Sequence, residues 1–176
     1  MSYRKQSRPQ YRSPRRAKPI RSLKRLKRAA DNPEQTAFLK QQNERELKAN
    51  PDLKPLKEKL LSLGGDFVAL QFEPDLNDIL KRGQVFDGKK ASSIRWPASH
   101  CHANVATLWD RTRNTRNTKI VTGWALSNDG IWRQHSWLLE TVVGEERVLE
   151  TTAPRAKYFG FVLTDDEAFK FWVDNR

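Results

Sequence analysis

The second half of the chain contains four β-rich segments in close succession, and this pattern constrains the fold more than any other feature of the sequence. The first two, residues 118–127 and 131–143, are joined by Asn-Asp-Gly, a strong hairpin signal. A turn at Gly144 leads to a third segment at 147–152, and a fourth follows at 157–164. Because strands joined by such short turns run in opposite directions, the pattern predicts an antiparallel sheet.

Helical segments surround this predicted sheet, so the expected fold class is α+β. The expected helices span residues 31–50, 52–65, 73–83, 101–111 and 165–175. Thr164 and Glu167 form a capping box that opens the last of them. Residues 66–72 predict a short strand, and residues 83–97 predict a loop.

Positive charge is concentrated at the N-terminus. Residues 1–32 contain 12 Lys/Arg and one acid, a net charge of +11, whereas the remaining 144 residues contain 21 Lys/Arg and 20 acids. A segment so charged and so poor in apolar residues cannot bury enough surface to offset the entropy of ordering it. We therefore expect a disordered basic tail over residues 1–32 and a single α+β domain over residues 33–176.

Two basic regions are candidates for contact with nucleic acid or another polyanion. One is the tail, and the other is the segment 111–119, which contains four basic residues and no acid. The candidate contact residues are Arg15, Arg16, Arg25, Lys27, Arg28, Arg111, Arg113 and Arg116. The competing interpretation is that the tail and this segment are simply solvated and bind nothing specific.

Several protein classes are disfavoured by the composition. A single cysteine rules out an internal disulfide framework, so nothing indicates an oxidising compartment. No apolar stretch approaches the roughly 20 residues that span a bilayer, and the N-terminus has no apolar signal region. We therefore expect a cytoplasmic protein with no membrane partner.

The stretch SHCHANVATLWD, residues 99–110, contains that one cysteine, Cys101, which is a nucleophile, a metal ligand or a small buried residue. A metal site needs three or four ligands, and His100 and His102 have no CxxC or HxxxH companion. We therefore expect no metal and no cofactor. As a nucleophile, Cys101 is well placed, because unpaired N–H groups and the helix dipole at a helix start favour the thiolate.

His135 is the best candidate for a partner of the thiol, since its strand is expected to pack beside this helix. Side chains alternate along a strand, so Glu140 points away from His135, whereas Glu150 on the next strand shares its face. One turn position would pair Glu150 with Leu139 and another would pair it with His135 directly; both keep Glu150 on that face. Glu150 is thus the candidate group that orients the imidazole.

The residues HSWLLETVVGEERVLETT resemble the His-x-Trp strand and the following acidic strand of transglutaminase-like domains, a branch of the papain-like superfamily. RNTKIVTGWALS is similar to the strand that precedes them there, and the resemblance covers roughly residues 95 to 153. It implies a papain-like fold with Cys101 as nucleophile, His135 as general base and acid, and Glu150 as the orienting acid. The chain departs from the family in having Glu150 where Asp is usual, followed by Thr151 in place of Pro.

The function that this resemblance implies is acyl transfer through a thioester, by hydrolysis or transamidation, on a protein or peptide-like amide. The Cys101 N–H is one candidate oxyanion donor; Gln84 and Trp96 are candidates for the second. His100 and Trp137 are candidates for lining the substrate site. The alternative function is a non-catalytic polyanion-binding protein that acts through its tail, and a third class is an effector acting on host proteins.

Overall fold

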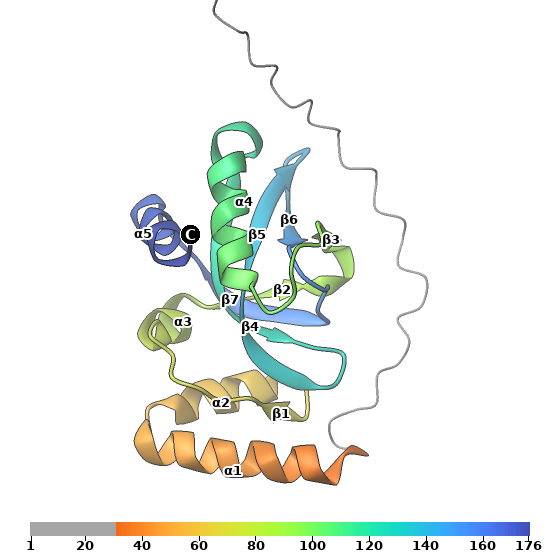
Figure 1. The fold of residues 1–176 in the computed structure, drawn as a ribbon, viewed down its shortest axis with the longest axis vertical. Helices are drawn as coiled ribbons and strands as arrows, with labels where there is room; N and C mark the ends of the chain where they lie inside the picture. The colour runs from red at the N-terminus through yellow and green to blue at the C-terminus, as the bar shows by residue number, and fades with distance from the viewer. Residues whose placement is uncertain (1–30) are drawn as a thin grey trace, which may run out of the picture.

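The computed structural model describes residues 31–176, which form five α-helices and seven strands (Figure 1). The helices are α1 (Pro33–Ala49), α2 (Leu53–Ser62), α3 (Leu76–Arg82), α4 (Cys101–Arg116) and α5 (Asp165–Asn175). The strands are β1 (Phe67–Val68), β2 (Gln84–Asp87), β3 (Ser92–Ser93), β4 (Thr118–Leu126), β5 (Ile131–Val142), β6 (Glu145–Glu150) and β7 (Lys157–Val162). The expected α+β class is confirmed.

The disordered tail was predicted over residues 1–32. Of these residues, only 31 and 32 lie within the described part of the chain. The basic candidates Arg15, Arg16, Arg25, Lys27 and Arg28 lie outside the described residues. None of the helices within residues 31–176 combines the length and the apolar composition needed to cross a bilayer.

The sheet is built around an antiparallel core. Its strands follow the order β2-β7-β4-β5-β6-β3, and β1 pairs with β5 beside this path. All pairings among β2, β7, β4, β5 and β6 are antiparallel, and those among β4, β5, β6 and β7 agree with the antiparallel sheet that the sequence predicts. The two-residue strands β1 and β3 add parallel pairings that the sequence pattern did not indicate.

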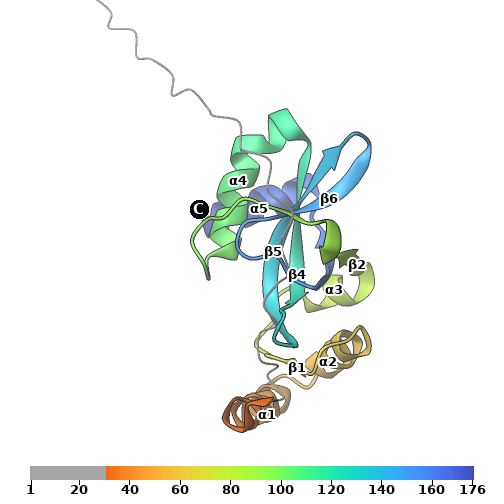
Figure 2. The ribbon, with the colours of Figure 1, turned by 90° about the vertical axis from the view of Figure 1, so that its right-hand side faces the viewer.

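The two edges of this sheet are held close together. β2 and β3 are the outermost strands, yet only the four residues 88–91 connect them, including a 3-10 turn, η2 (Gly88–Lys90). Five strand spacings across a flat sheet would cover about 24 Å. The connection from residue 87 to residue 92 reaches at most about 18 Å. The sheet must therefore curl toward a barrel, and Figure 2 shows it turned on itself beside α4 and α5.

Residues 83–97 were expected to be a loop, and this prediction was wrong. The segment contains both edge strands of the sheet, β2 and β3. Three of the four residues of β2 are exposed, so it lacks the alternation of apolar and polar residues that signals a strand. Its strand conformation comes from pairing with β7, from Gln84 opposite Gly160 to Asp87 opposite Lys157.

The two faces of the sheet have different neighbours. One face packs against the helices, and its contacts with α4 and α5 include Ile120, Leu138 and Leu149. The opposite face lines the inside of the curl, where Val121, Ala125, Trp137, Leu139, Val148 and Tyr158 form a buried cluster. Because His135 shares the parity of Trp137, its side chain belongs to this inner face.

Gly123 on β4 and Gly160 on β7 face each other and let these two strands approach closely on the inner face near His135. An added Cβ at Gly160 would lie 2.3 Å from the Thr122 carbonyl oxygen and 2.8 Å from the Trp137 ring. We expect Gly160→Ala to lower the free energy of unfolding by about 1–3 kcal/mol, because neither neighbour can move freely. Urea denaturation checks this. Gly144→Ala, whose added methyl meets nothing within 4 Å but whose φ is 80°, measures the cost of backbone strain without a clash. An unchanged free energy of unfolding in Gly160→Ala would contradict the close approach.

Candidate active site

The segment before Cys101 is fixed against the end of β6. The Ile94 N–H donates to the Glu150 carbonyl at 2.8 Å, and the Trp96 N–H donates to the Thr151 carbonyl at 2.9 Å. The chain therefore continues alongside the strand that carries Glu150 before it turns into α4. This attachment places Cys101, the first residue of α4, near Glu150, the predicted orienting acid.

The first turn of α4 is tied to the same segment. Asn104, which is 5% exposed, donates from Nδ2 to the Pro97 carbonyl at 2.8 Å. Ser99, between them, has φ of 64°, the left-handed conformation that a non-glycine residue adopts at a cost. His100 is the N-cap residue and makes no side-chain cap hydrogen bond. The turn that presents Cys101 is thus held by Asn104.

We expect Asn104→Ala to lower the free energy of unfolding by about 1–2 kcal/mol, since it leaves the Pro97 carbonyl without its donor. Urea unfolding of the purified protein measures this. Asn114→Ala on the same helix, where Asn114 is exposed, is the matched control and should change little. Equal effects of the two variants would contradict the role given to Asn104.

β5 has no strand partner over part of its length on one side. On the side away from β4, β1 pairs with residues 131–132 and β6 pairs with residues 138–142. Within the described part of the chain, no strand pairs with residues 133–137 on that side. Cys101 at the start of α4 and His135 on the inner face interact electrostatically, since His135 lowers the pKa of the thiol and the thiol raises the pKa of His135.

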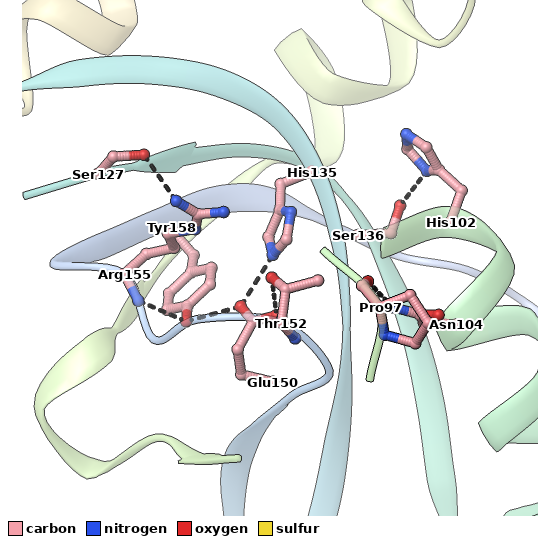
Figure 3. Close-up of polar contacts among 10 residues, drawn as sticks. All are labelled: Pro97, His102, Asn104, Ser127, His135, Ser136, Glu150, Thr152, Arg155 and Tyr158. Carbon is pink, nitrogen blue, oxygen red and sulfur yellow. Dashed lines mark hydrogen bonds and ion pairs between the residues drawn. The ribbon is translucent and has the colours of Figure 1, made fainter. Parts of the chain in front are cut away.

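His135 is fixed by Glu150 on the inner face. Nε2 of His135 lies 2.8 Å from Oε2 of Glu150, and both side chains are buried (Figure 3). The other carboxylate oxygen, Oε1, accepts from the N–H and from the hydroxyl of Thr152, at 2.8 and 2.9 Å. The Tyr158 hydroxyl donates to Oε2 at 3.1 Å. Glu150 is therefore held from three directions, and it fixes the ring of His135.

The register between β5 and β6 differs from both predicted registers. A two-residue turn at Val143–Gly144, with φ of 52° and 80°, pairs Leu138 with Leu149. Positive φ at both positions matches the type I′ geometry that suits a hairpin. Glu150 consequently sits one diagonal step from His135, between the two predicted positions, but on the predicted face.

The electrostatics of the site favour a charged pair. Burial raises the pKa of the Cys101 thiol, but hydrogen bonds with His102 and His135 outweigh it and lower the pKa to about 5. Burial lowers the pKa of His135, but its bonds to Cys101 and Glu150 outweigh this and raise the pKa to about 9. Between these values the stable form is a thiolate beside an imidazolium. Since Nε2 of His135 faces Glu150, Nδ1 is the nitrogen left for the thiol.

Glu150 and Tyr158 keep opposite protonation states. Burial raises the pKa of Glu150, but bonds from His135 and Thr152 outweigh it, so the net shift is downward and the carboxylate stays charged. Burial and the neighbouring carboxylate raise the pKa of Tyr158, so its hydroxyl stays a donor. Glu150 is thus an anion that accepts hydrogen bonds from His135, Thr152 and Tyr158.

Trp137 forms a wall of the histidine site and is not a surface that substrate meets first. Its ring stacks on His135 at 6.3 Å and is fully buried. Its Nε1 has no hydrogen-bond partner among the described residues. Tyr158 packs on the other rings of this cluster, 4.9 Å from Trp137 and 6.2 Å from His135. These aromatic rings exclude water from the imidazole.

The structure does not bring the two tentative oxyanion donors to the thiol. Gln84 lies on β2, three strands from β5, and lines a separate cavity with Leu139 and Val148. The Trp96 ring packs against the α4 cluster beneath the Arg111 guanidinium, at 5.5 Å. Neither location supports the predicted role.

Most of the basic segment 111–119 belongs to α4, which continues to Arg116 and is therefore longer than the sequence predicts. Its arginines are engaged within the domain. Arg113 pairs with Asp110 at 3.6 Å, and Arg116 pairs with Glu140 at 3.5 Å. Glu140 indeed lies on the face opposite His135.

His102 is a site residue that the sequence analysis left without a role. Its Nδ1 lies 2.8 Å from the Ser136 hydroxyl, on the helix side of β5 (Figure 3). His102 is also one of the two histidines that lower the pKa of the Cys101 thiol. Adjacent residues on a helix point in different directions, so no sequence pattern indicated that Cys101 and His102 both approach β5. Cys101 interacts with His135, and His102 interacts with Ser136. These two neighbours on β5 point to opposite faces of the sheet.

No group of three or more His, Cys, Asp or Glu side chains that could hold a metal ion occurs within residues 31–176. Comparisons of the chain with protein-family models, with curated proteins and with solved structures find no match. The chemistry of the site therefore rests on its geometry. The site contains a half-buried thiol, a buried imidazole and a buried carboxylate, the side-chain types that a nucleophile, a base and an orienting group require.

Proposed function

We propose that this protein is a cysteine-nucleophile acyl-transfer enzyme in which Cys101, His135 and Glu150 act as a triad. The observation that carries the proposal is that the buried His135 ring is held at Nε2 by the Glu150 carboxylate at 2.8 Å and acts on the Cys101 thiol, whose pKa it lowers. A nucleophile, a base and an orienting group linked in this order constitute the arrangement needed for covalent catalysis.

The proposed mechanism begins from the thiolate and the imidazolium. Sγ of Cys101 attacks the carbonyl carbon of an amide, and the His135 imidazolium gives its proton to the leaving amine. The carbonyl carbon then remains bonded to Sγ as a thioester. Water or an amine completes the reaction by attacking this thioester, which corresponds to hydrolysis or transamidation. The Cys101 N–H at the start of α4 is the proposed donor to the oxyanion.

A papain/transglutaminase-like fold is part of this proposal. It is supported by a helix that starts at the nucleophile and by a curled antiparallel sheet that carries the histidine and the acid on consecutive strands. We further propose a protein or peptide-like amide as substrate and a cytoplasmic location, where the thiol stays reduced. Polyanion binding by the tail remains a prediction, because its residues lie outside residues 31–176.

The experiment is acetylation of the full chain by p-nitrophenyl acetate, followed by intact mass. We expect a gain of one acetyl group on Cys101 that hydroxylamine removes, and no such gain in Cys101→Ser. An adduct of equal extent in both proteins would contradict the proposal.

The pH dependence of amide cleavage or transfer provides a further prediction. Acylation needs the thiolate as nucleophile and the imidazolium as proton donor. Its rate should therefore rise as pH increases through about 5, where the thiol ionises, and fall above about 9, where His135 loses its proton. Stopped-flow or mass-based acylation rates across this range, with an amide substrate once one is found, measure the profile. A rate that follows a single ionisation near pH 8.5, the ordinary value of a thiol, would contradict the ion pair.

A further inference from the structure

The thiol of Cys101 lies between two histidines whose surroundings differ. His135 is on the inner face of the sheet, bonded to Glu150 and 3% exposed. His102 is on the helix side, bonded to Ser136 and packed 5.9 Å from the Phe171 ring. Figure 3 shows the two histidines on opposite sides of β5. Only one of them is needed to activate the thiol, so the second calls for a separate explanation.

The hydrogen bonds of His102 define which of its nitrogens is basic. The Ser136 hydroxyl donates its one hydrogen to Oγ1 of Thr122 at 3.2 Å. Ser136 Oγ therefore accepts from Nδ1–H of His102, at 2.8 Å. In the neutral ring the lone pair is then on Nε2. Ser136 and Thr122 fix this tautomer in the way that Glu150 fixes the ring of His135.

A cavity of about 420 Å³ lies on the His102 side of the sheet. Its wall includes His102, Thr122, Gln134 and Phe171, whereas neither His135 nor Glu150 lines it. Cys101 does not line it either, so among the thiol and its two histidines only His102 faces this space. A small molecule in the cavity therefore meets His102 and not the ring of His135.

We propose that His102 is a second catalytic residue, which serves as general base for the acyl acceptor that enters through this cavity. The inference rests on the proposed acyl-transfer function. The acceptor's lone pair attacks the thioester carbonyl while its O–H or N–H proton passes to Nε2 of His102. The tetrahedral intermediate collapses, the C–S bond breaks, and its electron pair returns to Sγ as the thiolate. His102 then releases its proton to water in the cavity, and His135, whose pKa is about 9, takes up a proton from water before the next turnover. His135 serves the leaving group in the first half-reaction, and His102 serves the acceptor in the second.

The charge of the cavity restricts which acceptors it admits. Its wall contains one lysine, Lys170, against five carboxyl side chains. These are Glu73, Asp75, Asp78, Glu167 and Asp174. Such a lining disfavours anions, so the acceptor is water or an uncharged or cationic nucleophile.

The test follows the two half-reactions separately on the intact protein at pH 8, well above the thiol pKa of about 5. Acetyl-enzyme is formed with p-nitrophenyl acetate, excess reagent is removed, and intact mass follows first the gain and then the loss of the acetyl group. In His102→Gln we expect acetylation within about threefold of the native rate and deacetylation slower by about 10²-fold, the scale of general-base catalysis. Asn114→Ala, at an exposed position of the same helix, is the control and should change neither rate.

Rescue by a small base distinguishes a catalytic role of His102 from a purely structural one. Imidazole added to His102→Ala should restore deacetylation in proportion to its concentration, with no effect on acetylation, because it replaces the missing base in the cavity. Equal slowing of both half-reactions, or an unchanged deacetylation rate, would overturn the assignment of His102 while leaving the triad intact. Absence of any Cys101 acetylation in the native protein would overturn the proposed function and this inference with it.

Discussion

In His135→Ala, the midpoint of Cys101 alkylation by iodoacetamide is expected to move upward by about 1–3 pH units. The native midpoint should lie near pH 5, where bonds with His102 and His135 hold the thiol pKa despite burial. Removing His135 removes the imidazolium that stabilises the thiolate and leaves the desolvation cost of a half-buried anion. A midpoint that rises by one pH unit corresponds to about 1.4 kcal/mol of lost thiolate stabilisation. Initial alkylation rates measured by intact mass from pH 4 to 10 determine both midpoints.

Two controls make this result specific. Denatured chain reports the unperturbed thiol and should titrate near pH 8.5. His100→Ala removes an exposed histidine next to Cys101 that makes no cap hydrogen bond, and its profile should match that of native protein. If native Cys101 titrated like the denatured chain, or if His135→Ala left the midpoint in place, there would be no ion pair and no basis for the triad.

Glu150→Gln is expected to reduce the rate of acylation by about 10²- to 10⁴-fold while the shape of the site is kept. Two Thr152 groups donate to Oε1 of Glu150, so the amide oxygen of glutamine would take that position. The amide NH₂ would then face His135 Nε2 and turn that nitrogen into an acceptor. The ring proton would move to Nδ1, and a neutral His135 could no longer accept the proton of the thiol.

This prediction has a matched control on the preceding strand. Glu140→Gln makes the same chemical change at a carboxylate on the opposite face, where Glu140 pairs with Arg116. We expect it to leave acylation within about twofold of the native rate, because exposed and partly exposed ion pairs contribute little. The rate of acetyl adduct formation measures both variants. Equal rates in Glu150→Gln and native protein would exclude Glu150 as the orienting acid.

The parts of the site that could be predicted follow from strand and helix periodicity. Alternation along β5 and β6 placed Glu150 on the face of His135 under either predicted turn, and the observed register keeps that parity. The position of Cys101 at the start of a helix followed from its place before an apolar helical face, and α4 begins there. Both features depend on local patterns, which neighbouring residues alone specify.

Other parts of the site could not be predicted, because they are contacts between distant segments. Tyr158 comes from β7 and reaches Glu150 only because the sheet curls. His102 hydrogen-bonds Ser136 because α4 packs on the face of β5 to which Ser136 points, and no residue spacing in the sequence predicts this packing. Gln84 is a plausible oxyanion donor by residue type alone, and the fold places it on an edge strand three strands away from β5.

The sequence by itself determined the order of helices and strands over most of the domain, the hairpins, and the residues that share each strand face. These depend on turn residues and on periodicity, which act within a few residues. Only the tertiary structure decided that β2 and β3 join the sheet and that four residues draw its edges together. It also decided that Cys101 and His135 lie close enough to shift each other's pKa. Such contacts arise from burying distant apolar faces together, and their geometry is set by the whole packed chain.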